Sequence, residues 1–173
     1  MKGRNAFGMY ACLLAAGCAF SLTGCGKKSP LDPGNPVSLT VWHYYNGAQQ
    51  VAFDTLVEEF NDTVGREEGI FVQGYSQGSV SDLETAVRDS INGKVGAEAM
   101  PDVFSSYADT AYEVEQAGAL ANLSEYLDEE ELGKYVDSYI EEGRIAKDGT
   151  LRIFPTAKST EIMMINKTDW ETF

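Results

Sequence analysis

Five consecutive residues place three aromatic rings, an imidazole and an amide side by side: Trp42, His43, Tyr44, Tyr45 and Asn46. The electron-rich face of an aromatic ring attracts the polarised C–H groups of a sugar ring and excludes water from them. Trp42, Tyr44 and Tyr45 are therefore candidates for stacking on a carbohydrate, and His43 and Asn46 for hydrogen bonds to its hydroxyls. The alternatives are core packing for the rings, an internally satisfied role for His43, and helix capping for Asn46.

Two later segments add polar side chains of the kind that recognise hydroxyls: Gln77, Ser79, Tyr107 and Asp109. Vicinal hydroxyls need both donors and acceptors, which amides and carboxylates supply together. The alternative for these residues is local duty in loops, and Asp109 in particular is placed to cap a helix. They are interpreted as candidate ligand contacts.

All of these candidates fall where predicted strands end. Apolar alternation over 37–41 predicts a strand that continues into 42–47, and shorter strands are expected at 70–74 and 101–106. Because the strands alternate with helices, the sequence predicts an α/β fold with a mainly parallel sheet flanked by helices. Ligands of such sheets bind at the carboxyl ends of the strands, where these side chains lie.

The helices between the strands are predicted from apolar residues at helical spacing. A stripe after the first strand contains Phe53, Leu56, Val57, Phe60 and Val64. The residues Ser81-Asp82-Leu83-Glu84 have the form of a capping box that begins the next helix, and Asn92-Gly93 ends it. Further helices are expected over 109–116 and 124–142, and extended chain over 151–155 and 160–166.

The N-terminus has the features of a secretory leader. Lys2 and Arg4 precede a stretch without charge from Asn5 to Gly26. Leu22-Thr23-Gly24-Cys25 resembles the bacterial lipobox, which implies removal of residues 1–24 and acylation of Cys25. Residues 25–36 contain Pro30, Pro33 and Pro36 and are interpreted as a flexible tether between membrane and domain. The alternative is an uncleaved anchor in which Cys25 is incidental.

Charge and cysteine content limit the function further. The net charge is −14, and loss of the two basic residues of the leader makes it more negative, so nucleic acid is not an expected partner. Cys12 and Cys18 leave with the leader, so the mature chain has no disulfide and depends on its core. The acidic run at Asp128–Glu131 is interpreted as a solvated surface. Neither a metal site nor a cofactor is predicted.

Several motifs occur in one order behind the lipobox: "FN" at Phe60-Asn61, "AMPDVF" at 99–104, "AGALANLSEYL" at 117–127 and "FPTAKSTEIMMINKTDW" at 154–170. Together they resemble the extracellular solute-binding proteins of ABC importers, the family 1 sugar type. One departure is that Met164-Ile165 stand where the family often has two tyrosines.

The resemblance implies a periplasmic-binding-protein-like (type II) lobe that captures a mono- or oligosaccharide and delivers it to membrane permease subunits. Such a receptor is not an enzyme, works as a monomer, and is held by its lipid on the extracytoplasmic face of the cell membrane. The family often lines its cleft with the segment that crosses between the lobes. The resemblance therefore adds Lys158, Ser159 and Thr160 to the candidate ligand contacts.

The resemblance also implies a domain plan. Residues 37–150 are expected to form the N-terminal lobe, and 151–173 to begin the crossover toward a second lobe. Because the family's chains are more than twice as long, we expect this sequence to be a fragment or a truncated gene with an incomplete second lobe.

Three other functions compete with the sugar receptor. Trp42-His43 and the spacing of the 155–167 segment are similar to glycerol-phosphate receptors, although Ser79 and Ala108 replace a tyrosine and a glutamate of that subgroup. A surface adhesin would use the same tether. An enzyme is the weakest alternative, because the chain contains one histidine and no nucleophile or metal motif.

Overall fold

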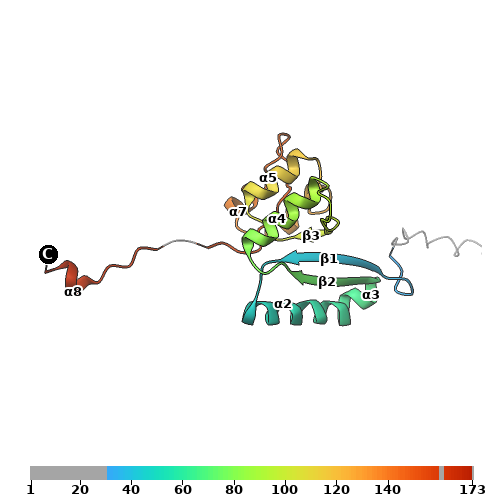
Figure 1. Cartoon of the computed structure of the whole chain (residues 1–173), viewed down its shortest axis with the longest axis horizontal. Coiled ribbons are helices and arrows are strands. Elements are labelled where there is room, and N and C mark those ends of the chain that lie inside the picture. The colour runs from blue at the N-terminus through green and yellow to red at the C-terminus, as the bar shows by residue number, and fades with distance from the viewer. Residues whose placement is uncertain (1–30, 160–161, 173) are drawn as a thin grey trace, which may run out of the picture.

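The computed structural model describes residues 31–159 and 162–172 (Figure 1). The predictions on the leader, on Cys25 and on Thr160 therefore lie outside the described residues. The elements that carry the fold are β1 (Val37–His43), α2 (Gly47–Phe60), β2 (Ile70–Ser76), α4 (Val80–Ile91), β3 (Val103–Phe104) and α5 (Ala108–Gln116). Shorter helical segments are η1 (Asn61–Gly65, a π-helix), α3 (Arg66–Glu68), η2 (Leu123–Glu125, a 3₁₀-helix), α6 (Glu129–Leu132), α7 (Asp137–Glu141) and α8 (Lys167–Trp170).

Within the described part of the chain the strands form a three-stranded parallel sheet in the order β2-β1-β3. β1 pairs with β2 from Val37↔Ile70 to His43↔Ser76, so both strands end at the same level. The predicted α/β class with a parallel sheet is confirmed. The shared register brings the loops after β1 and β2 to one edge of the sheet.

Helices cover the two faces of the sheet differently (Figure 1). On one face, α4 and α5 pack over β1, where Trp42, Leu83, Val87 and Val114 form a buried cluster. Each of these side chains is at most 4% exposed. A fully buried aliphatic or aromatic side chain contributes about 1.5–3 kcal/mol relative to its exposed state, so this cluster is the principal apolar core around the sheet.

The other face of the sheet is covered by α2, none of whose residues, all described, is buried. The predicted apolar stripe is only partly correct, because Phe53, Val57 and Phe60 are half-buried while Leu56 and Val64 are 64% and 51% exposed. Phe53 approaches β2 closely, since a Cβ at Gly74 would lie 3.0 Å from its ring.

A polar clamp joins the end of α2 to β2. The Asn61 amide donates to the Val72 carbonyl and accepts from the Val72 N–H, both at 2.8 Å. These two backbone groups point away from β1, along the open edge of the sheet. Unpaired edge groups favour pairing with other chains, so Asn61 both anchors the helix and protects the edge.

The helix predicted over 124–142 is wrong. The structure has η2, α6 and α7 there, separated by turns: α6 ends at Leu132 with Gly133 as its C-cap, and α7 begins at Asp137 with Val136 as its N-cap. The breaks let Leu132 and Ile140 pack together against Leu151, forming a second buried cluster that a straight helix would not. Asp128 caps α6 by accepting from the Glu131 N–H. Of the run Asp128–Glu131, predicted to be solvated, the first three residues are exposed and Glu131 is half-buried and paired with Lys134.

The start of α4 also differs from the prediction. The helix begins at Val80, and its cap is Ser79, whose hydroxyl oxygen accepts from the Asp82 N–H at 3.1 Å. The expected capping box at Ser81 is therefore displaced by two residues. Asp82 at the third helical position replaces the glutamate of the usual pattern and receives the Ser79 hydroxyl at 2.6 Å.

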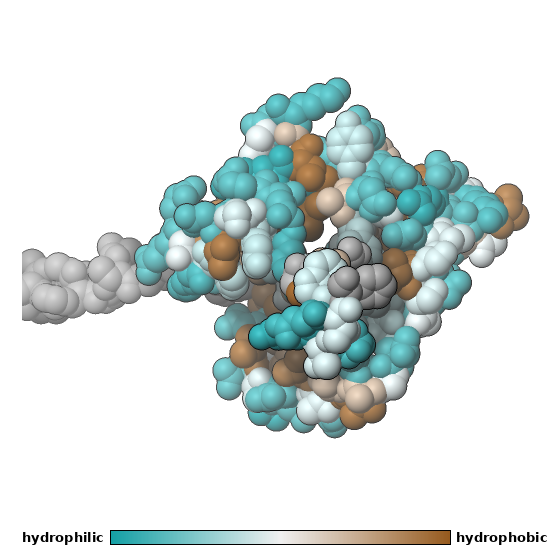
Figure 2. All heavy atoms as spheres, turned by 90° about the vertical axis from the view of Figure 1, so that its left-hand side faces the viewer, coloured by the Kyte–Doolittle hydropathy of each residue, from teal (hydrophilic) through white to brown (hydrophobic). Residues whose placement is uncertain are grey.

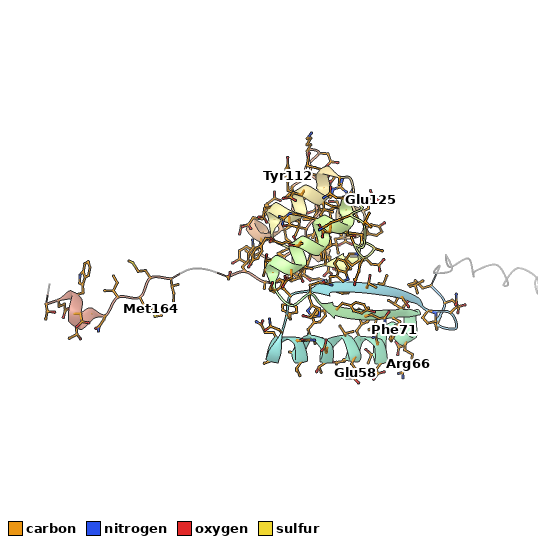
Figure 3. All side chains as sticks on the ribbon, in the orientation of Figure 1. Glu58, Arg66, Phe71, Tyr112, Glu125 and Met164 are labelled. Atoms are coloured by element: carbon orange, nitrogen blue, oxygen red, sulfur yellow. The ribbon has the colours of Figure 1, made fainter. Side chains whose placement is uncertain are left out.

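After Leu151 the chain continues without regular structure to α8 and leaves the body (Figure 1). Met164 lies on this segment, away from the sheet (Figure 3), and Ile162, Met163 and Met164 are 72%, 85% and 86% exposed. Among the described residues, no helix has the length and apolarity needed to cross a membrane.

Candidate functional site

The loops that follow the strands meet at one edge of the sheet, which we call the strand-end site. It contains Tyr44 and Tyr45 after β1, Gln77 after β2 and Tyr107 before α5. Figure 2 views the molecule from the side toward which the strand arrows of Figure 1 point, with the C-terminal segment in front; the surface drawn around that segment is mostly polar or intermediate in hydropathy. This edge brings together the candidates that the sequence spreads over 64 positions.

Three tyrosines form the aromatic part of the site. The rings of Tyr44 and Tyr45 are half-buried, with centroids 5.3 Å apart and a 53° angle between planes. Burial raises the pKa of Tyr44, and the nearby hydroxyls of Tyr45 and Tyr107 raise it further. The Tyr44 hydroxyl therefore stays protonated and available as a hydrogen-bond donor. Tyr107 is 55% exposed and presents its ring to solvent.

Trp42 lies in the core, at 4% exposed, and packs against α4 and α5. Of the two roles considered from sequence, the structure gives its ring the packing role. One part of Trp42 still borders a cavity of about 200 Å³ together with Gln77, Ala86, Asp89, Ala97 and Glu98. Gln77 is half-buried and is the member of this cavity that belongs to the strand-end site.

His43 is 1% exposed and lies on the α2 face of the sheet. Its Nδ1 accepts a hydrogen bond from the Tyr45 N–H at 3.2 Å, so the neutral ring carries its proton on Nε2. The ring stacks on Tyr45 at 5.3 Å and contacts Phe53 at 4.5 Å. Burial lowers the pKa of His43, an effect that the Asp54 carboxylate partly offsets. This geometry supports Tyr45 from inside the protein.

Three hydrogen bonds to backbone carbonyls connect the loops of the site. The Asn46 amide donates to the Gly78 carbonyl at 3.1 Å, and the Ser76 hydroxyl donates to the Tyr45 carbonyl at 2.7 Å. The Gln77 N–H donates to the His43 carbonyl at 2.8 Å. Asn46 occupies the capping position of α2 but makes no side-chain cap there. Its side-chain nitrogen joins two loops instead.

The side chains of Ser79 and Asp109 accept hydrogen bonds from backbone N–H groups at the starts of helices. Ser79 caps α4, and Asp109 in the first turn of α5 accepts from the Thr110 N–H at 2.8 Å. Both side chains are exposed.

Lys158 and Ser159 of the crossover belong to neither a helix nor a strand. Lys158 forms an ion pair with Glu142, and its ammonium group lies 5.4 Å from the centre of the Tyr139 ring. Ser159 is exposed on the segment that leaves the body, and Thr160 is outside the described residues. The structure does not bring Ser159 into contact with the tyrosines of the strand-end site.

Two supporting residues were missed from sequence. Phe53 reads as part of the α2 stripe, although its ring also contacts Tyr45 at 5.4 Å. Ser76 gave no signal beyond its place at the end of a strand.

A second cavity of about 320 Å³, lined by Glu115, Gln116 and 146–148, lies at the end of α5 opposite Tyr107. Across the described ranges, no group of histidine, cysteine and acidic side chains could hold a metal ion.

The solved structures that superpose on this chain include solute-binding proteins. The cyclic α-maltosyl-1,6-maltose binding protein from Arthrobacter globiformis superposes with a TM-score of 0.56 and 25% identity, covering 67% of this chain and 27% of its own. The maltose/maltodextrin-binding domain from Bdellovibrio bacteriovorus, bound to maltotriose, gives 0.52 and 16%, with coverages of 66% and 27%. A family 1 extracellular solute-binding protein from Bifidobacterium longum subsp. infantis gives 0.51 and 15%, with coverages of 69% and 27%.

These matches confirm the predicted fold, an α/β part of one lobe of a periplasmic-binding-protein-like molecule, and the resemblance to sugar-type solute-binding proteins. The chain spans about a quarter of the length of these neighbours, 27% in each of the three. No family model and no curated protein matches the chain. The neighbours are binding proteins and not enzymes.

Proposed function

We propose that this chain is the ligand-capturing part of a lipid-anchored receptor that binds a carbohydrate outside the cytoplasm and delivers it to the permease of an ABC importer. The observation that carries the proposal is the cluster of Tyr44, Tyr45 and Tyr107 at the carboxyl ends of parallel strands. Tyr44 and Tyr45 are half-buried and Tyr107 is exposed, and aromatic rings at such an edge are suited to stack on a sugar while their hydroxyls bond to its oxygens.

The charge of the site favours a neutral ligand. The segments 42–46, 76–82 and 104–109 contain no lysine or arginine, and they contain the carboxylates of Asp82 and Asp109. A phosphoester needs cationic or convergent N–H donors, whereas a sugar hydroxyl is satisfied by tyrosine, amide and carboxylate groups. A carbohydrate is therefore preferred to the glycerol-phosphate alternative.

The ligand test is saturation-transfer NMR on the chain with maltotriose, using glycerol 3-phosphate in parallel. We expect millimolar binding of the sugar and none of the phosphoester, because one part of a two-lobed cleft provides only some of the contacts. Tyr44→Ala should weaken maltotriose binding about 2- to 12-fold, corresponding to about 0.5–1.5 kcal/mol for an aromatic contact.

The matched control for Tyr44→Ala is Tyr126→Ala. Tyr126 follows η2 and is 77% exposed, so its loss should leave sugar binding unchanged. Equal weakening by both variants, or binding of glycerol 3-phosphate alone, would reject the carbohydrate proposal.

The lipid anchor has a separate test. In cells supplied with labelled palmitate, the chain should incorporate label and sediment with membranes, and Cys25→Ala should abolish both. Label that persists in Cys25→Ala would reject acylation at this cysteine, and the result does not depend on which solute binds.

A further inference from the structure

Trp42 and His43 are the two described candidate ligand residues whose side chains are buried, and His43 is the one whose ring contacts Tyr45. It is the only histidine in the sequence and is 1% exposed. Such burial excludes direct contact between the His43 side chain and a solute. The ring instead contacts Tyr45 of the strand-end site, by a hydrogen bond and by stacking.

The hydrogen bond requires one protonation state. Nδ1 accepts from the Tyr45 N–H and therefore must carry no proton. Nε2 is buried and has no hydrogen-bond partner among the described residues. A proton added to Nδ1 would remove the acceptor, leave two N–H groups facing each other, and put a charge where little water reaches.

The surroundings of the ring offer little compensation for that charge. Phe53 of α2 and Tyr45 contact its faces, and Gly74 of β2 lies beside Nε2. β2 contains no charged residue, and the charged group that acts on His43 is Asp54 of α2. After protonation, moving the Tyr45 backbone away from the ring costs less free energy than keeping two N–H groups opposed next to a buried charge.

We propose that His43 is a positioning residue whose neutral ring holds Tyr45 in its ligand-contacting place, so that protonation of His43 releases Tyr45 and weakens solute binding. The solute part of this inference rests on the proposed function, whereas the effect on Tyr45 does not. The lowered pKa of His43 agrees with the geometry, because the structure favours the neutral ring.

The test is NMR on the ¹⁵N-labelled chain between pH 7.5 and 5, where one histidine gives one unambiguous ring titration. We expect the Tyr45 amide to lose its protection from hydrogen exchange as His43 titrates. The Gln77 amide is the internal control, since it donates to the His43 carbonyl and not to the ring. It should stay protected, which separates local release from unfolding.

Maltotriose affinity is measured over the same range. It should fall as His43 titrates, and His43→Phe should bind about 2- to 12-fold more weakly at pH 7.5, the range expected for one lost hydrogen bond, with no pH dependence. His43→Gln keeps an acceptor without titrating and should remove the pH dependence with a smaller loss of affinity.

The inference is overturned if the Tyr45 amide stays protected while His43 is charged, or if the wild type and His43→Phe share one pH profile. If no variant binds maltotriose at any pH, the proposed function fails, and the Tyr45 and Gln77 amides of the wild type still decide the positioning role. The amide pair also decides it if His43→Phe does not fold.

Discussion

The two faces of the sheet are stabilised by different interactions. Under α4 and α5, Leu83 and Val87 are 2% and 0% exposed and pack on Trp42. Under α2, no helical residue is buried, and the helix is held by half-buried rings and by the Asn61 clamp on β2. The first face supplies apolar core, and the second supplies the polar and aromatic contacts that run from Phe53 through His43 to Tyr45. Tyr45 is therefore positioned from the less buried side, whereas Tyr44 packs against the buried cluster under α4 and α5.

The largest expected difference between the faces is in leucine truncation. Leu83→Ala should lower the free energy of unfolding by about 2–5 kcal/mol, because it leaves a cavity in a closed core. Leu56→Ala on α2 should change it by less than about 0.5 kcal/mol, since that side chain is 64% exposed. Urea denaturation of both variants measures the difference, and equal losses would contradict the distinction between the faces.

Next in size is the polar clamp on the α2 face. Asn61→Ala should cost about 1–3 kcal/mol, because it removes two hydrogen bonds and leaves the partly buried Val72 backbone groups without them. Asn92→Ala is the control, since the Asn92 amide donates at an exposed helix end to Arg88. Urea denaturation should rank the two in that order, and a neutral Asn61→Ala would mean that packing alone holds α2.

The third prediction concerns pH and belongs to the α2 face alone. The pKa of His43 is lowered in the folded state, so the unfolded state binds the proton more tightly from pH 6.5 down to the folded value. The free energy of unfolding should therefore fall as pH falls through that window, by about 1.4 kcal/mol for each unit of lowering. His43→Phe should lack this component. Urea denaturation of both proteins from pH 5 to 7.5 checks it, and identical pH dependence would contradict it.

The smallest expected effect concerns the start of α4. Ser79→Ala should cost about 1 kcal/mol, because the Asp82 N–H loses its cap. Ser81→Ala, at the exposed position that the sequence pattern favours as cap, should be nearly neutral. Thermal unfolding of the two variants distinguishes the caps. A larger loss of stability in Ser81→Ala than in Ser79→Ala would show that Ser81 is the cap, as the sequence pattern predicts.

The strands and the larger helices can be predicted from sequence because alternation and helical spacing are local properties. Local spacing predicts one helix over 124–142 because the apolar residues there fit a helical stripe, whereas the break at 133–136 serves contacts with Leu151, which lies outside that segment. Such contacts leave no mark on the local pattern.

The candidate site was predictable in position but not in side-chain direction. The rule that ligands bind at strand ends places Tyr44, Gln77 and Tyr107 at one edge, as the structure does. Successive side chains of a strand point to opposite faces of the sheet, so Trp42 and His43 lie on opposite faces, and both are buried. The sequence alone does not show which of these faces is covered. The support that Phe53 gives to His43 and Tyr45 also depends on tertiary packing.

The central claim is that a neutral sugar binds at the strand-end site, and chemical-shift mapping on the ¹⁵N-labelled chain with maltotriose tests it most directly. The account predicts that the largest amide shifts occur at Tyr44, Tyr45 and Tyr107. Shifts confined to the cavity at Glu115 and 146–148, or no shifts at saturating millimolar sugar, would contradict it.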